Sequence, residues 1–242
     1  VPHLTAEQFD RNYTTENVSM MPAMINTLIM TALTLVIAVP IGVFAAVYLV
    51  EYAKRGNKLV KIIRVTTETL SGIPSIVFGL FGYLMFNISF GWGFSMMAGV
   101  ITLAMMILPL IIRTTEEALL AVPDSYREGS FGLGAGKMRT VFRVILPTAV
   151  PGIMSGVILS IGRIVGESAA LIFTSGSGHS IPGSLVGSGS SAATLTVHMY
   201  ILSNEGLHVN EAFASAVVLL ALTFLINLVS DLIERRIAKK KG

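Results

Sequence analysis

The segment GRIVGES (162–168) places two opposite charges inside a long apolar run that is otherwise uncharged. Arg163 and Glu167 are four residues apart, a spacing that puts both side chains on one face of a helix. A charge at the centre of a bilayer costs at least about 2.5–3.5 kcal/mol, so this face should look onto other helices or a wet cavity. A guanidinium binds oxyanions through paired N–H donors. Two interpretations stay open: Arg163 is a cationic station for an anion crossing the membrane, held by Glu167, or the pair only holds helices together.

A second group of polar side chains lies in another apolar segment. Glu68 follows Arg64 by four residues, which predicts a local ion pair at the membrane interface. Ser71 and Ser75 are the two ends of SGIPS, whose Gly and Pro favour a helix break. Broken helices expose backbone groups on substrate paths, although neighbouring side chains also satisfy an ordinary proline kink. Glu68, Ser71 and Ser75 are therefore further candidates for lining such a path.

The elements that must position these residues are five apolar stretches, each long enough to cross a membrane as a helix. The 242-residue chain is 53% hydrophobic and 13% charged, against roughly 25% charged in soluble domains, and its mean hydropathy is +0.75. We expect an all-α polytopic membrane helix bundle, with Pro40 kinking the first helix. The predicted spans are 22–50, 65–88, 95–113, 148–173 and 212–233, in one transmembrane domain (22–236) between an external segment (1–21) and a basic cytoplasmic tail (237–242).

The distribution of Lys and Arg predicts how these helices are oriented. All but two of the 17 basic residues lie in 51–64, 113–146 and 235–241, and none lies in 89–94 or 174–211. The positive-inside rule places the basic segments in the cytoplasm and the N-terminus of this chain outside. The pI near 9.3 therefore reflects topology and not a nucleic-acid partner. Because the chain starts outside, we also expect a sixth helix upstream of Val1 in the native gene product.

The external loop 174–211 is rich in Ser and Gly, which predicts a flexible segment with a short helix over 201–208. All four histidines (His3, His179, His198 and His208) fall on the outer side. None is spaced from another as helical metal ligands are, so we expect solvated side chains and no metal site. The chain has no Cys, which excludes disulfides and thiolate metal sites.

The cytoplasmic loop 114–147 contains GLGAGK, which fails the spacing of nucleotide-binding loops and follows no predicted strand. We therefore expect no nucleotide on this chain. The loop instead predicts two short amphipathic helices at a glycine turn. Ser125 and Glu128 fit a capping box, Gly134 suits a positive φ, and Pro147 should start the fourth span. On spacing alone, an amphipathic connector on the membrane surface is an equal alternative.

The same loop resembles the cytoplasmic signature of ABC importer permeases, E-A-A-x3-G-x9-I-x-L-P. Its Glu, Gly, Leu and Pro recur at the right spacing, while Gly and Ser replace the two Ala and Val replaces Ile. The matching positions are Glu128, Gly129, Ser130, Gly134, Leu146 and Pro147. Elsewhere, EYAKR, SGIPSIVFGLFGY, LPLIIRTTEEALLAVPDSYRE and SIGRIVGESAALIFTSG resemble the phosphate-specific (PstA-type) permeases of the MetI-like class.

This resemblance implies the membrane-spanning subunit of an ATP-driven phosphate importer in a bacterial or archaeal cell (inner) membrane, usually with six spanning helices. The implied partners are the lipid bilayer, a second similar permease chain in a heterodimer, two ABC ATPase subunits and an extracellular phosphate-binding protein. ATP and Mg²⁺ would sit on the ATPase, so no catalytic residue is expected here, and the loop helices at Ser125–Gly134 would dock on it. The alternatives are a permease for sulfate, molybdate or phosphonate, or an ion-coupled secondary transporter. An intramembrane hydrolase is disfavoured, because the spans hold no His and no paired Asp.

Overall fold

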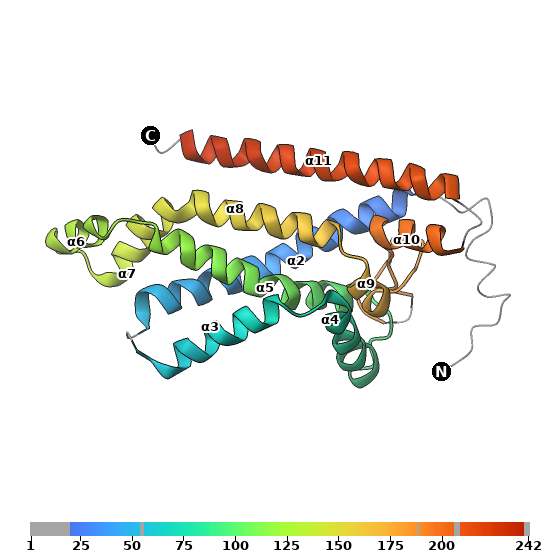
Figure 1. Ribbon diagram of the computed structural model, residues 1–242, viewed down its shortest axis with the longest axis horizontal. Helices are drawn as coiled ribbons and strands as arrows, with labels where there is room; N and C mark the ends of the chain where they lie inside the picture. The colour runs from blue at the N-terminus through green and yellow to red at the C-terminus, as the bar shows by residue number, and fades with distance from the viewer. Residues whose placement is uncertain (1–19, 54–55, 188, 206–208, 240–242) are drawn as a thin grey trace. The chain divides into compact units, whose positions relative to one another are not determined.

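The structure, a computed structural model, describes residues 20–53, 56–187, 189–205 and 209–239, and every regular element in these ranges is helical (Figure 1). This confirms the all-α prediction. In chain order, with η for a π-helix, the elements are α2 (Met21–Val47), η1 (Tyr48–Tyr52), α3 (Lys58–Ser71), α4 (Ser75–Gly82), η2 (Tyr83–Ser89), α5 (Met96–Leu120), α6 (Asp124–Gly132), α7 (Lys137–Thr140), η3 (Val141–Ile145), α8 (Leu146–Val165), α9 (Ala169–Thr174), α10 (Leu195–Glu205) and α11 (Val209–Lys239).

Four helices in the described ranges are long and apolar enough to cross a membrane: Met21–Tyr52, Met96–Leu120, Lys137–Val165 and Asn210–Ser230. A fifth span is present if the sharply bent pair Val60–Ser71 and Ser75–Ser89 counts as one. The predicted break at SGIPS is thus confirmed, since α3 ends at Ser71 and α4 begins after Pro74. The first helix runs on through Pro40.

The fourth predicted span differs from the observed helix at both ends. The helix starts at Lys137 and is continuous to Val165, so Pro147 lies inside it and does not begin it. Proline lacks an N–H and its ring crowds the carbonyl four residues earlier. The wide turns of η3, directly before Leu146, give that carbonyl room. At the other end, the chain leaves the helix after Val165 and enters α9 at Ala169.

The chain forms two compact units. Within the described residues, unit 1 contains 20–34, 74–103 and 165–224, and unit 2 contains 35–73, 104–164 and 225–239. The predicted N-terminal segment and the end of the basic tail lie largely outside the described residues, as do His3 and His208.

In unit 1, the Ser/Gly-rich segment before α10 is irregular, and residues 181–186 are mostly exposed, but its last part is packed into the protein. Ser190 is fully buried, and residues 192–198 are buried as well. The Nδ2 group of Asn26 donates to the carbonyls of Ser180 and Ala193, each at 3.2 Å. Small side chains allow this close backbone approach, and the buried amide satisfies the carbonyls that it reaches. The helix predicted at 201–208 is also longer at its start, because α10 begins at Leu195.

In unit 2, the core is formed by apolar side chains from α2, η1, α5, η3 and α8, including Leu119 and Ile145, both fully buried. A ridge of small residues on α8, Gly152 and Gly156, lies against α5. A Cβ at Gly152 would lie 2.7 Å from the Cβ of Ala118, and one at Gly156 would lie 2.7 Å from the Cβ of Thr114. Only glycine permits this close packing, which sets the position of α8 on α5.

Candidate functional site

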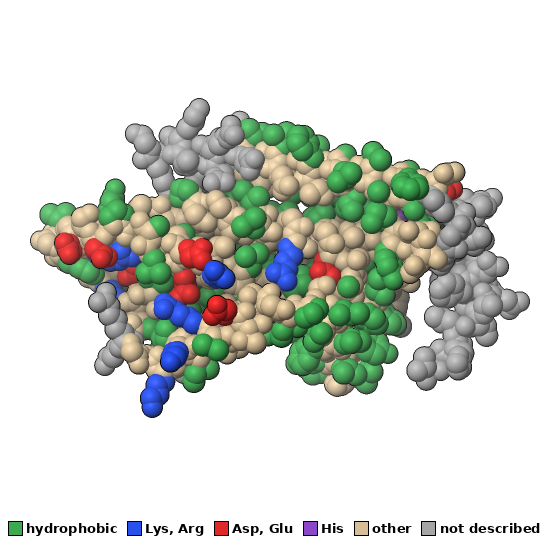
Figure 2. Space-filling view, in the orientation of Figure 1, with side chains coloured by type: hydrophobic (Ala, Val, Ile, Leu, Met, Phe, Trp, Pro, Cys, Tyr) green, Lys and Arg blue, Asp and Glu red, His purple; other side chains and the backbone are tan. Residues whose placement is uncertain are grey.

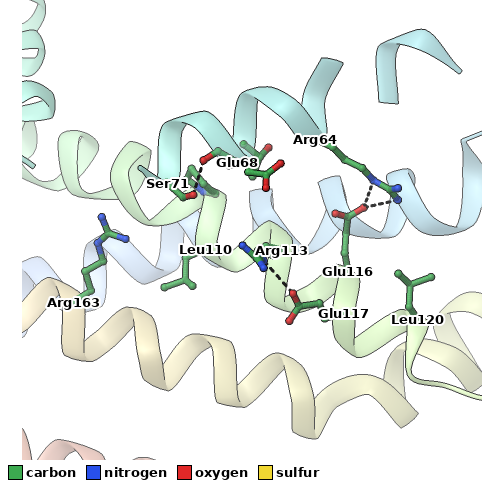
Figure 3. Close-up of a pocket in the computed structure, with 11 residues that line it drawn as sticks. Arg64, Glu68, Ser71, Leu110, Arg113, Glu116, Glu117, Leu120 and Arg163 are labelled. Atoms are coloured by element: carbon green, nitrogen blue, oxygen red, sulfur yellow. Dashed lines mark hydrogen bonds and ion pairs between the residues drawn. The ribbon is translucent and has the colours of Figure 1, made fainter. Parts of the chain in front are cut away.

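Unit 2 contains a cavity of about 360 Å³ with a strongly charged lining (Figure 3). We call it the charged cavity. Figure 2 shows Lys, Arg, Asp and Glu side chains gathered on the face over α3, α5 and α6. Three helices line the cavity: α3 with Arg64, Thr67, Glu68 and Ser71; α5 with Pro109, Leu110, Arg113, Glu116, Glu117 and Leu120; and α8 with Arg163.

The helix geometry explains why Arg163 reaches this cavity. Arg163 follows Gly156 by seven residues, which is two helical turns. It therefore lies on the same face of α8 as the ridge of small residues. The ridge packs against α5 at Thr114. Leu110, which lines the charged cavity, lies one turn before Thr114 on α5. Arg163 is half-buried, and Figure 3 shows its guanidinium directed away from α8. The packing of these small residues on α5 thus places Arg163 at the charged cavity.

Of the five other charged side chains that line the cavity, four form two ion pairs. Both Nε and Nη2 of Arg64 donate to Oε1 of Glu116, at 3.2 and 3.0 Å. The predicted pair between Arg64 and Glu68 is therefore wrong, because the long Arg side chain reaches across to α5 instead of along its own helix. The second pair joins Nε of Arg113 to Oε1 of Glu117 at 3.1 Å.

Within the part of the chain that the structure describes, Arg163 and the Glu68 carboxylate are the charged groups of the cavity that form no ion pair. The hydroxyl of Ser71 donates to the main-chain carbonyl of Glu68 at 2.7 Å. The charged cavity thus offers a guanidinium with unused N–H donors on α8 and an acceptor carboxylate on α3. An anion with water around it fits this chemistry.

Two predicted path residues are not in the cavity. Because α8 ends at Val165, Arg163 and Glu167 do not share a helix face, contrary to the prediction. Oε1 of Glu167 instead accepts the N–H of Ala170 at 3.1 Å, in the first turn of α9. Ser75 starts α4. Both belong to unit 1. The structure therefore brings together Arg163, Glu68 and Ser71 of the five predicted residues.

The loop 114–147 forms the first predicted short helix, α6, but the second is not separate, because α7 continues through η3 into α8 as one helix from Lys137 to Val165. The predicted cap of α6 also differs. The N-cap of α6 is Pro123, no side chain caps the helix, and Ser125 lies inside it, so the capping box with Glu128 is wrong. A proline with φ −56° and ψ 140° already sets the entry into the helix. The glycine turn is confirmed, since Gly134 has φ +80° and its N–H donates to the carbonyl of Phe131 at 2.9 Å.

The remaining signature residues divide into an exposed and a packed group. Ser125, Glu128 and Gly129 are exposed, and Ser130 bonds the hydroxyl of Thr140 at 2.8 Å. Leu146 packs on the core of unit 2, and Pro147 is half-buried. Around the turn, apolar side chains face solvent, above all Leu133, which is 92% exposed. Phe131 and Met138 are exposed with it. Exposed apolar side chains gathered in this way mark a surface suited to a partner protein.

Sequence reasoning missed the contact that holds this loop. Arg127 donates to Oε1 of Glu51 from Nη2 at 2.7 Å and from Nε at 3.1 Å. It also donates to the carbonyls of Val122 and Leu119, at 2.9 and 3.0 Å. This joins α6 to η1 at the end of the first span. The sequence offered one signal for this contact: Glu51 is a single acidic residue shortly before the basic stretch 54–64, so it was a candidate partner for an arginine.

Two histidines of the segment 174–211 also differ from their prediction. His198 is only 1% exposed, and its ring centroid lies 5.8 Å from that of His179 in an edge-on arrangement. Burial, and to a lesser extent His179, lowers the pKa of His198 to about 4. Burial lowers the pKa of His179 as well. His198 is thus a neutral buried side chain and not a solvated one.

Comparison with known proteins bears on these features. Residues 38–241 match the family described as "Binding-protein-dependent transport system inner membrane component". The chain is 42% identical over 151 residues to the probable ABC transporter permease protein YqgI of Bacillus subtilis (strain 168), which covers 62% of this chain and 51% of that protein. It is 34% identical over 212 residues to the phosphate transport system permease protein PstA 1 of Mycobacterium tuberculosis (strain CDC 1551 / Oshkosh), covering 88% of this chain and 69% of that protein.

Solved structures show the same fold. An inward-facing MetNI methionine ABC transporter chain matches with a TM-score of 0.69 at 24% identity, covering 92% of this chain and 94% of that one. A bacterial ABC transporter that imports alginate matches with a TM-score of 0.69 at 16% identity, covering 97% and 85%. The chain spans about half the length of the Bacillus relative and about two thirds of the Mycobacterium one.

Proposed function

The chain belongs to the family of binding-protein-dependent transport system inner membrane components, and on this premise we propose that it is the permease subunit of an ATP-driven importer of inorganic phosphate. Its relatives are permease subunits of ABC transporters, and several of them carry phosphate transport in their names. The observation that carries the proposal is Arg163, a guanidinium that forms no ion pair within the described chain and lies on a membrane-spanning helix, in a cavity of about 360 Å³.

Arg163 serves as a station for the crossing anion. An isolated anion is strongly disfavoured in an apolar medium. A guanidinium offers planar, paired N–H donors that match two oxygens of a tetrahedral oxyanion. The neighbouring pairs Arg64–Glu116 and Arg113–Glu117 are already neutralised, so they do not hold the anion strongly. Glu167 and Ser75, in unit 1, stay candidates for another part of the path.

The loop around α6 docks on a separate ATPase subunit, where ATP and Mg²⁺ bind. The exposed apolar side chains at the Gly134 turn support this role, together with the exposed Glu128 and Gly129. The pair Arg127–Glu51 then links movement of α6 to the first span. A second permease chain completes the translocation path, and an extracellular phosphate-binding protein delivers the anion. The N-terminus of this chain lies outside and the C-terminus in the cytoplasm.

The test is uptake of [³²P]phosphate into liposomes that contain the full-length chain with the subunits that co-purify with it, with and without internal ATP. We expect ATP-dependent uptake that excess sulfate or molybdate does not abolish. Arg163→Gln should lower uptake at least about thirtyfold, equivalent to about 2 kcal/mol for a lost charged hydrogen-bond partner.

Arg143→Gln is the matched control, because it removes an exposed guanidinium outside the charged cavity; it should leave uptake near the wild-type value. Uptake that persists without ATP would instead indicate a secondary transporter. Preferential uptake of sulfate or molybdate would assign another oxyanion.

A further inference from the structure

The carboxylate of Glu68 is exposed and takes part in neither ion pair of the charged cavity. It faces the charged cavity from α3, on the same helix face as Arg64 and Ser71, which lie four residues before it and three after it. Its neighbour in sequence, Arg64, is held by Glu116. In the residues that the structure describes, no cation and no hydrogen-bond donor pairs with the Glu68 side chain. Figure 3 shows it among the cavity side chains.

An ionised carboxylate only accepts hydrogen bonds. An anion that stops at Arg163 therefore shares its cavity with a negative acceptor. A fully deprotonated oxyanion such as sulfate has nothing to donate to that acceptor and is repelled by its charge. Inorganic phosphate keeps at least one proton throughout the physiological pH range, so it can turn an O–H towards the carboxylate and two other oxygens towards the guanidinium.

We propose that Glu68 is a specificity-determining residue, which admits oxyanions that carry a proton and rejects those that carry none. The inference rests on the proposed function, because it assumes that an anion is held at Arg163. It deepens that function by naming the ligand class: a protonated tetrahedral oxyanion. Discrimination of this kind works by an unfavourable contact with the wrong ligand as well as by a favourable one with the right ligand.

The cavity size fits this role. At about 30 Å³ for each water, its 360 Å³ holds on the order of ten waters. A phosphate ion therefore fits with part of its hydration, and one bridging water can complete the contact to Glu68 or Arg163. Because Glu68 is exposed, water screens part of its repulsion of any anion, and the missing O–H donor of sulfate is the main basis for the discrimination.

The test measures anion binding to the purified complex of the full-length chain and its co-purifying subunits, without the extracellular binding protein, which would impose a selectivity of its own. Equilibrium binding of [³²P]phosphate at pH 7 is competed with unlabelled phosphate or sulfate. We expect sulfate to compete at least about tenfold more weakly than phosphate in the wild type. Glu68→Gln supplies an N–H donor and removes the charge, so it should bring sulfate within about threefold of phosphate.

Two further variants sharpen the result. Glu68→Asp keeps the charged acceptor and should keep most of the discrimination. Glu211→Gln, an exposed carboxylate of α11 in unit 1, should keep the wild-type ratio. An unchanged ratio in Glu68→Gln would overturn the inference, and so would a wild type that does not discriminate.

Arg163→Gln separates the two proposals. If it loses phosphate binding while Glu68→Gln leaves the ratio unchanged, the anion station stands and the selectivity role of Glu68 fails. If Arg163→Gln binds phosphate like the wild type, the charged cavity is not the anion site, and both proposals fail.

Discussion

Replacing Arg127 should destabilise the protein more than replacing any exposed arginine. The side chains of Arg127 and Glu51 are only 16% and 9% exposed, and their closest contact is 2.7 Å. Arg127→Gln removes the cation, leaves the Glu51 carboxylate without its partner, and frees the carbonyls of Leu119 and Val122. Breaking a buried pair in this way costs about 3–5 kcal/mol. We expect about 3 kcal/mol, because this pair is not fully buried.

The assay is the thermal unfolding midpoint of the purified protein in detergent, where 3 kcal/mol corresponds to a fall of roughly 6–12 °C. Arg113→Gln is the matched control. Its pair with Glu117 has the same chemistry but is 65% and 64% exposed, so its loss should cost at most about 0.5 kcal/mol. Equal midpoints for the two variants would refute the reasoning, as would additive effects in the double variant Glu51→Gln/Arg127→Gln.

Two further predictions concern packing and pH. Gly156→Ala should cost about 1–3 kcal/mol of unfolding free energy, because its Cβ meets Thr114, whereas Gly162→Ala in the same helix meets nothing within 4 Å and should be neutral or mildly stabilising; equal unfolding midpoints would contradict this. The pKa of His198 is lowered from 6.5 to about 4 by burial, so the unfolded chain binds more protons between these values. Lowering the pH from 7 to 5 should therefore reduce the unfolding free energy by about 1–2 kcal/mol. In His198→Phe most of this pH dependence of the midpoint should disappear, and an undiminished dependence would assign it to other groups.

The spans and the SGIPS break were predictable because they follow from local composition. About 20 apolar residues are needed to cross a bilayer whatever the rest of the chain does, and Pro74 interrupts a helix by its own covalent structure. The glycine turn at Gly134 follows from local sterics in the same way.

What could not be predicted depends on contacts between distant segments. Arg64 had a partner at helical spacing in Glu68, but the structure pairs it with Glu116, 52 residues away. The buried environment of His198 depends on tertiary packing that a Ser- and Gly-rich composition does not encode. The end of α8 at Val165 was missed, because Gly166, Glu167 and Ser168 have apolar residues on both sides and the whole stretch has the composition of one span.

Thiol modification in the charged cavity tests the central claim most directly. The chain has no Cys, so Ser71→Cys introduces its one thiol at an exposed cavity position. In the reconstituted complex, we expect an anionic thiol reagent to label this chain and phosphate to slow the labelling. Adding Arg163→Gln should remove that protection. A thiol that does not react, or that reacts equally fast with and without phosphate while Arg163 is present, would contradict the account.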